Sequence, residues 1–160
     1  MKLPIDDSQH PEIKTLEYNK ITENIYVGTN QCCRMDFDAV LVKEGMTYDV
    51  SLEKERIDAP YGVISYVWIP VADHQAPTQE QIGFGVFVLE RIVAMGKKVY
   101  AHCKNGHGRA PTLVAAYFIK QGKTVDEAIA IIKEKRQTTH LEEVQVQALH
   151  QWAGSIKNQI

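Results

Sequence analysis

Residues 102–109 read His-Cys-Lys-Asn-Gly-His-Gly-Arg, and this stretch decides how the surrounding chain folds. Residues 98–101 before it are typical of a short buried strand, and residues 111–120 after it predict an apolar helix. A strand, a tight loop that contains glycine and a helix N-terminus together form a cradle for an anion. The reason is that unpaired backbone N–H groups and the positive end of the helix dipole converge at that point.

Cys103 and Arg109 stand six positions apart, with glycines between them. A thiol at a helix N-terminus ionises more easily than a free thiol, so the cradle would both activate Cys103 and aim it at the bound anion. The planar guanidinium of Arg109 suits two oxygens of a phosphate at once. An inert core cysteine is the alternative, but it leaves the arginine and the helix start unexplained.

The rest of the chain predicts strands first and helices later. The expected strands are residues 21–27, 48–52 and 62–71, with 39–42 either a strand piece or a helix turn. Two capping boxes, Thr78 with Gln81 and Thr124 with Glu127, predict helix starts. The helix after Thr78 carries an apolar stripe and ends at Gly96. The residues expected to face inward from a last helix over about 142–157 are Val144, Ala148, Trp152 and Ile156.

This order of elements predicts an α/β fold in which helices flank a central, mainly parallel sheet, with the Cys-x5-Arg loop between a strand and a helix. We expect residues 1–20, which are polar and aperiodic, to form an N-terminal arm. Residues 21–160 would form a single domain, because 160 residues are enough to bury one core.

Composition excludes several classes of partner. A net charge of −2 provides no general basic field, so we do not expect nucleic acid to bind. No apolar run approaches the roughly 20 residues of a membrane span, and residues 1–7 lack the features of a signal peptide. The odd set Cys32, Cys33 and Cys103 favours a reducing compartment, and we expect the cytoplasm. We regard Cys32 and Cys33 as incidental rather than as disulfide partners of Cys103.

Residues 102–109 resemble the His-Cys-x5-Arg signature of the cysteine-based protein tyrosine phosphatases, in the compact dual-specificity branch. The similarity extends from Ile21 to about Trp152. It implies metal-independent hydrolysis of a phosphate monoester through a cysteinyl-phosphate on Cys103, with no cofactor. The residues that would bind the phosphate are Lys104, Asn105, Gly106, His107, Gly108 and Arg109.

The resemblance also implies a general acid on a loop about 30 residues before the cysteine. Asp73 precedes Cys103 by 30 positions and follows a predicted strand; the alternative is an aspartate that only shapes the turn. His102 would hold the loop and stabilise the thiolate, not act as a base. Gln145 would hold the hydrolytic water, with a plain surface glutamine as the equal alternative.

One position departs from the family pattern. The family usually has Ser or Thr directly after the arginine, where its hydroxyl helps sulfur leave the phosphoenzyme, but this chain has Ala110. Thr112 lies two residues further on and cannot be assumed to substitute. We therefore predict slow breakdown of the intermediate, with phosphate binding intact.

The leading function is hydrolysis of protein phosphotyrosine, extending to phosphoserine and phosphothreonine. A phosphatase of non-protein esters, such as inositol phosphates, phospholipid headgroups or nucleotides, stays open, because only Lys104 and His107 add basic character to the loop. A non-catalytic phosphate-binding module and a sulfur-transfer enzyme of the rhodanese type are the further alternatives. No Cys/His spacing suggests zinc, and the sequence indicates no oligomeric state.

Overall fold

The protein is described here by a computed structural model, which covers residues 16–30, 38–58 and 60–157. The elements, in chain order, are β1 (Tyr18–Lys20), β2 (Ile25–Thr29), η2 (Asp38–Val42), β3 (Met46–Glu53), β4 (Ser65–Val71), α1 (Gln79–Ala94), β5 (Lys98–Cys103), α2 (Arg109–Lys120), α3 (Val125–Lys135) and α4 (Glu143–Lys157). Among these residues, none of the helices is long and apolar enough to cross a bilayer.

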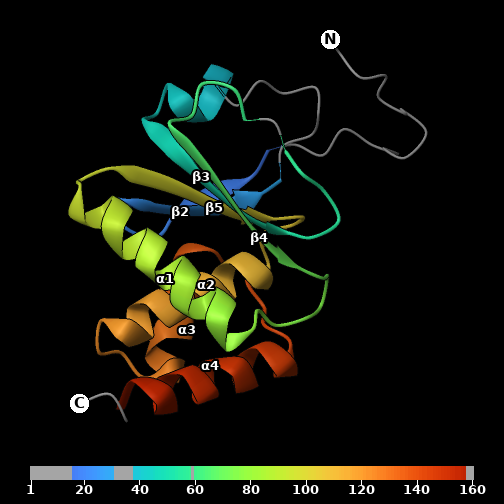
Figure 1. Ribbon diagram of the computed structural model, residues 1–160, viewed down its shortest axis with the longest axis vertical. Helices are drawn as coiled ribbons and strands as arrows, with labels where there is room; N and C mark the ends of the chain where they lie inside the picture. Colours follow the sequence, from blue (N-terminus) through green and yellow to red (C-terminus); the bar gives the residue numbers. More distant parts are fainter. Residues whose placement is uncertain (1–15, 31–37, 59, 158–160) are drawn as a thin grey trace.

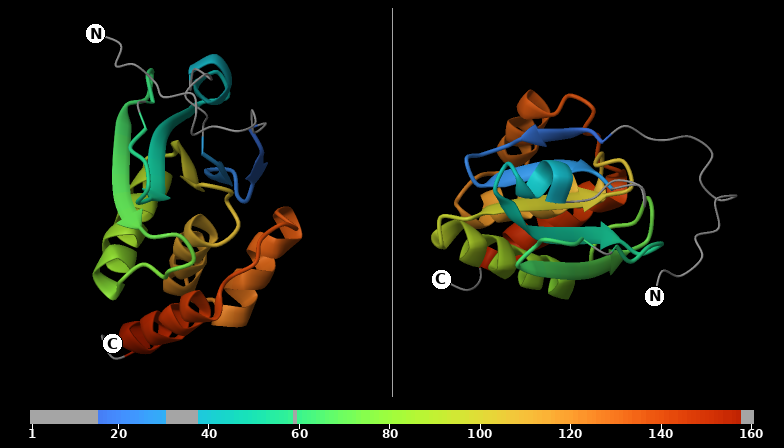
Figure 2. Two further views of the ribbon diagram at one scale, coloured as in Figure 1. Left: turned by 90° about the vertical axis from the view of Figure 1, so that its right-hand side faces the viewer. Right: turned by 90° about the horizontal axis from the view of Figure 1, so that it is seen from above.

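The strands of the described residues form one sheet in the order β1-β2-β5-β3-β4. β1 pairs with β2 in the antiparallel sense, and the other neighbours are parallel. Helices α1, α2, α3 and α4 lie together on one side of the sheet, while the short helix η2 lies on the other (Figures 1 and 2). The predicted α/β class with a mainly parallel sheet is therefore confirmed.

The main core lies between the sheet and the four α-helices. Alternate residues of each central strand point into it, among them Val50 of β3 and Val99, Ala101 and Cys103 of β5. The opposite face carries a smaller cluster in which Tyr26, Met46 and Tyr100 pack against Leu41 of η2. β5 is the central strand of the sheet, and Cys103 is its last residue. Cys103 therefore lies at the carboxyl ends of the parallel strands, which is the usual place for a site in such folds.

Both predicted capping boxes are present. The Thr78 hydroxyl accepts from the Gln81 N–H, and the Gln81 side chain accepts from the Thr78 N–H. Thr124 and Glu127 make the same pair at the start of α3. α1 ends just before Gly96, whose φ of 66° is the left-handed conformation that glycine adopts without strain.

Several element boundaries differ from the prediction. Tyr18–Lys20, expected within an arm, forms β1 because its backbone pairs with β2. The strand predicted over 21–27 begins only at Ile25, since the Thr22 hydroxyl accepts from the N–H groups of Asn24 and Ile25 and makes a turn. Residues 38–42 form a helical turn, the second of the two alternatives.

The inward face predicted for the last helix is correct except in its first turn. Ala148 is buried, and Trp152 and Ile156 are partly buried and pack against the core, as predicted. Val144, expected to face inward, is 42% exposed, so that expectation is wrong. The buried residue of the first turn is Gln145, whose side-chain amide is hydrogen-bonded to backbone groups on both sides.

Candidate active site

The loop between β5 and α2 has the shape of an anion cradle. β5 ends at Cys103, whose thiol is free and only 3% exposed, and α2 begins at Arg109. Gly108 is the N-cap of α2 and makes no side-chain capping bond, so the first N–H groups of the helix have no partner from a capping side chain. Gly106 has a φ of 67°, and a Cβ there would collide with the Gly28 carbonyl. The chain can turn this tightly because Gly106 has no side chain.

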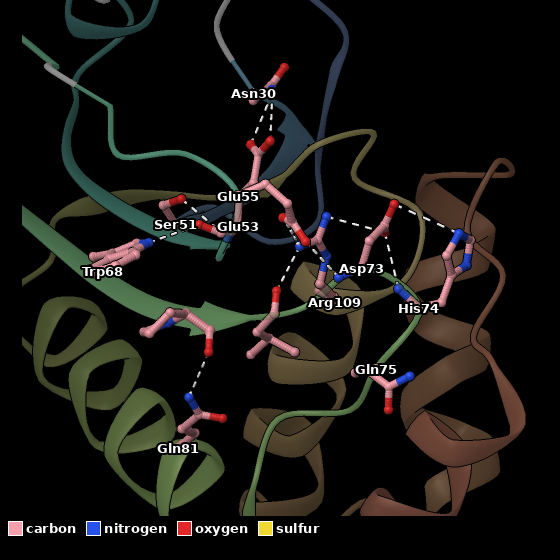
Figure 3. A network of polar contacts seen from close by, with 12 residues as sticks. Asn30, Ser51, Glu53, Glu55, Trp68, Asp73, His74, Gln75, Gln81 and Arg109 are labelled. Carbon is pink, nitrogen blue, oxygen red and sulfur yellow. Dashed lines mark hydrogen bonds and ion pairs between the residues drawn. The ribbon is translucent and has the colours of Figure 1, made fainter.

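Arg109 is 2% exposed, and its guanidinium is held from two sides. Its Nη1 donates to Glu55 Oε2 at 2.7 Å and to the Val71 carbonyl at 2.7 Å, and its Nη2 lies 3.2 Å from Asp73 Oδ1 (Figure 3). Burial alone would lower the pKa of Arg109, but the hydrogen bond with Glu55 raises it overall. The arginine is therefore a fixed cation beside the nucleophile.

Asp73 lies in the loop that follows β4, as predicted, and its side chain is 45% exposed. Its N–H donates to Glu55 Oε1 at 2.7 Å, so one glutamate contacts both the aspartate loop and Arg109 (Figure 3). The next residue, His74, has a φ of 61° and lies with Nδ1 2.9 Å from Glu142 Oε1. The hydrogen bond with Glu142 and the charge of Asp73 raise the pKa of His74.

A pocket of about 280 Å³ opens at this edge of the sheet. Its lining residues are Asp73, His74, Cys103, Asn105, His107, Gly108, Arg109, His140, Glu142 and Gln145. The structure thus brings Cys103, Arg109 and Asp73 together, as the sequence predicts. Two residues expected to bind the phosphate are not among the lining residues: Lys104, which is exposed, and Gly106, which is buried within the loop.

Gln145 is not a surface glutamine, since it is only 1% exposed. Its Oε1 accepts from the Glu142 N–H at 2.9 Å, and its Nε2 donates to the Gln75 carbonyl at 3.0 Å. The side chain lies against Gly108, where an added Cβ would meet it. Gln145 therefore joins the aspartate loop to α4 at the pocket wall, and its role with water stays a prediction.

Arg136 is not indicated by any sequence pattern, yet it shapes the loop. Its Nε donates to the Gly106 carbonyl at 2.8 Å, its Nη2 to the Asn105 carbonyl at 2.9 Å, and its Nη1 to Asn19 Oδ1 at 2.7 Å. Two loop carbonyls are thereby held away from the cradle, which leaves the amides to line it. A larger pocket, of about 540 Å³, lies between β1 and the end of α3 and is lined by Arg136, but no cysteine or histidine is among its lining residues.

The position after the arginine is closed to solvent. Ala110 is fully buried, and the Thr112 hydroxyl donates to the Gly108 carbonyl at 2.7 Å. That proton is committed to the first turn of α2, so Thr112 does not offer it to sulfur.

Cys32 and Cys33 lie outside the described residues. Within the described residues, no three His, Cys, Asp or Glu side chains are placed to hold a metal ion.

The chain is similar to known phosphatases. The human phosphatidylglycerophosphatase and protein-tyrosine phosphatase 1 is 34% identical over 81 residues, which are 50% of this chain and 40% of that protein. Rat dual specificity protein phosphatase 5 is 33% identical over 75 residues, 46% of this chain and 20% of that protein. This chain thus matches less than half the length of these two relatives.

The fold is similar to that of PTPMT1, with a TM-score of 0.80 and 23% identity over 89% of this chain and 97% of that one. The family model for the dual specificity phosphatase catalytic domain matches residues 25–154, which include the whole pocket lining. The resemblance carried by residues 102–109 is confirmed, and the chain belongs to the dual specificity phosphatase catalytic domain family.

Proposed function

We propose that this chain hydrolyses phosphate monoesters without a metal ion, through a phosphate carried on Cys103. The observation that carries the proposal is the presence of Cys103, Arg109 and Asp73 in one pocket, at the N-terminus of α2. The fixed charge of Arg109 and the loop amides would stabilise the equatorial oxygens of the transferring phosphoryl group, which is the largest contribution in such reactions.

The reaction would proceed in two displacements. In the first, the Cys103 thiolate forms a bond to phosphorus while the ester P–O bond breaks, and Asp73 gives its proton to the leaving oxygen. In the second, water attacks phosphorus with Asp73 as base, the S–P bond breaks, and the thiolate and inorganic phosphate are released. The exposure of Asp73 on the pocket wall supports this role, because it must reach both the leaving group and water.

The substrate class that we propose is protein phosphotyrosine, with activity on phosphoserine and phosphothreonine. The match to the dual specificity catalytic domain supports this reading. Non-protein esters are the second candidate. Their support is the name of the human relative, a phosphatidylglycerophosphatase as well as a protein-tyrosine phosphatase, and the PTPMT1 structure in complex with PI(5)P.

We also infer a cytoplasmic location, because a free catalytic thiol needs a reducing compartment. Microscopy of a tagged chain tests this location.

The experiment is hydrolysis of an aryl phosphate by the wild type and Cys103→Ser, with and without EDTA, at several values between about pH 5 and 7. We expect turnover that EDTA leaves unchanged and that Cys103→Ser abolishes. Mass spectrometry after an acid quench should find phosphate on Cys103. No turnover under reducing conditions would favour a phosphate-binding module instead.

Parallel assays on phosphotyrosyl, phosphoseryl and phosphatidylinositol phosphate substrates, each reported as kcat/KM, would rank the two substrate classes. Asp73→Asn separates a phosphatase from a sulfurtransferase, since only the phosphatase needs an acid for a leaving oxygen. We expect that variant to lose turnover while it still binds inorganic phosphate.

A further inference from the structure

A chain of four charged side chains lies on the face of the sheet opposite the catalytic helices. Side chains alternate along β5, so Cys103 points into the helix-covered core while His102 points to the other face. There, His102 Nε2 lies 3.1 Å from Asp49 Oδ1 and 3.4 Å from Asp58 Oδ2, and Arg56 Nε lies 2.9 Å from Asp58 Oδ1. We call Asp49, Arg56, Asp58 and His102 the back cluster.

The back cluster is balanced in charge only when His102 is protonated. The side chains of His102, Asp49 and Asp58 are 2%, 1% and 8% exposed, so these three charges are largely removed from water, whereas Arg56 is 23% exposed. Two buried carboxylates with Arg56 as their only cation would leave one negative charge unpaired, which is costly in a protein interior. With an imidazolium, two carboxylates face two cations.

Three further titratable groups surround His102: Glu53, whose buried negative charge also favours a protonated imidazole, and Tyr66 and Tyr100, which are neutral hydroxyls. Glu53 of β3 is engaged by the Asn30 amide at 2.9 Å, and Tyr66 of β4 accepts from the Asp58 N–H at 3.2 Å. Tyr100 of β5 stacks on the His102 ring at 5.4 Å and donates its hydroxyl to the Thr29 carbonyl. Burial by itself would lower the pKa of His102, but the charges of Asp49 and Asp58 raise it overall. Burial also raises the pKa of Asp58.

Residues 53–58 connect the back cluster to the active site. At one end, Glu53 closes β3, and its carbonyl accepts from the Trp68 indole N–H at 2.8 Å. At the other end, Asp58 is held between Arg56 and His102. Between these two anchors stands Glu55, which bonds Arg109 and the Asp73 N–H, each at 2.7 Å. The position of Glu55 therefore depends on how firmly Asp58 is held.

We propose that the back cluster positions the active site: Asp49, Arg56 and Asp58, acting with His102, hold residues 53–58 so that Glu55 fixes Arg109 and the Asp73 loop. These are positioning residues, since none of the four lines the pocket. The inference rests on the proposed phosphatase activity for its kinetic consequences, but not for its structural ones. Deprotonation of His102 unbalances the cluster, loosens Asp58 and lowers activity on the basic side of the pH profile.

The test compares Asp58→Asn, which keeps the shape and removes the charge, with Asp126→Asn, a matched change on the exposed side of α3. We expect Asp58→Asn to lower kcat/KM for an aryl phosphate about 10- to 100-fold, as small misplacements of catalytic groups do. The basic limb of its pH profile should move to lower pH, and Asp58→Glu, which restores the charge, should move it back. Asp126→Asn should match the wild type.

NMR titration of the His102 ring supplies an activity-independent readout. We expect His102 to titrate above the ordinary imidazole range in the wild type and lower in Asp58→Asn. Weaker inhibition or binding by inorganic phosphate in Asp58→Asn should accompany this, because Arg109 would lose its fixed position. If no variant turns over substrate, the proposed function fails, while the titration and phosphate binding still test the positioning role.

All kinetics should be measured at a temperature where circular dichroism finds each variant folded. Two results would overturn the inference. One is an ordinary His102 titration in the wild type. The other is an Asp58→Asn protein that unfolds at lower temperature but keeps the wild-type kcat, KM, phosphate affinity and pH profile in its folded state.

Discussion

Replacing Arg136 by lysine should damage the phosphate cradle while the chain stays folded. Arg136 makes three hydrogen bonds in different directions, two of them to the loop carbonyls of Asn105 and Gly106. The single ammonium of a lysine keeps the charge but cannot reach all three acceptors. Hydrogen bonds from charged donors contribute about 1.5–3 kcal/mol each, so the loss of two bonds lowers the free energy of unfolding by about 3 kcal/mol or more.

A domain of this size typically has about 5–15 kcal/mol of stability, so Arg136→Lys should remain folded at 25 °C. The freed carbonyls can then rotate toward the cradle, and their negative ends oppose the phosphate. We expect inorganic phosphate to inhibit about 10- to 100-fold less well, and kcat/KM for an aryl phosphate to fall by a similar factor.

The assay measures the inhibition constant for phosphate, kcat/KM and a denaturant unfolding curve for the wild type, Arg136→Lys and Lys135→Ala. Lys135 is the matched control, because it precedes Arg136 but forms only an exposed ion pair with Glu134. Its loss should change stability by less than about 0.5 kcal/mol. A folded Arg136→Lys protein with wild-type phosphate inhibition would refute the view that Arg136 orients the loop.

Three further predictions concern the chemistry and the pH response. Asp73→Asn should lower kcat about 10²- to 10⁴-fold, most for the poorest leaving groups, and a leaving-group series checks it. Ala110→Ser should speed breakdown of the phosphoenzyme about tenfold through one added hydrogen bond, so a stopped-flow burst seen in the wild type shrinks; fast wild-type turnover without a burst contradicts this. The pKa values of His102 and Asp58 are both raised, so the folded state binds more protons than the unfolded state. Their contribution to the free energy of unfolding is therefore full at pH values below the ordinary pKa values. It is lost as the pH rises through the raised pKa values of the folded state, and unfolding curves measured across pH test this direction.

The parts of the fold that the sequence predicts correctly are those with local causes. A capping box is complete within four residues, so Thr78 and Thr124 mark the starts of α1 and α3 without knowledge of the rest of the chain. The loop at Cys103 is equally local, because the strand, the glycines and the helix start are consecutive. The loop that carries Asp73 cannot be assigned from local pattern alone. Asp73 is assigned because the family resemblance implies an acid about 30 residues before Cys103.

Predictions fail where a contact distant in sequence decides a local choice. Tyr18–Lys20 has no strong strand pattern and becomes β1 because β2 offers a free edge. In the first turn of α4 the buried residue is Gln145 and not the apolar residue Val144 beside it, because the Gln145 amide bonds the Gln75 carbonyl, 70 residues earlier in the chain. Periodicity cannot indicate that a polar residue belongs to the buried face when its partners lie in another element.

Glu55, Arg136 and the back cluster also act through partners that are distant in sequence. They explain why a signature of eight residues is not a complete account of the site. The signature supplies the groups proposed to bind phosphate, and two of them are held by residues distant in sequence. Arg136 holds Gly106 from 30 positions away, and Glu55 holds Arg109 from 54 positions away. Both partners are charged residues, one at the end of a helix and one beyond the end of a strand. Charged residues are common at such positions, so the sequence alone does not indicate that these two hold the site. A loop amide or a guanidinium that rotated freely would have to be ordered during the reaction. The free-energy cost of that ordering would reduce the stabilisation that it gives to the transition state. The electrostatic strength of the cradle is therefore set as much by Arg136 and Glu55 as by the signature, and a chain that kept Cys103 and Arg109 but lost these two residues should bind phosphate weakly.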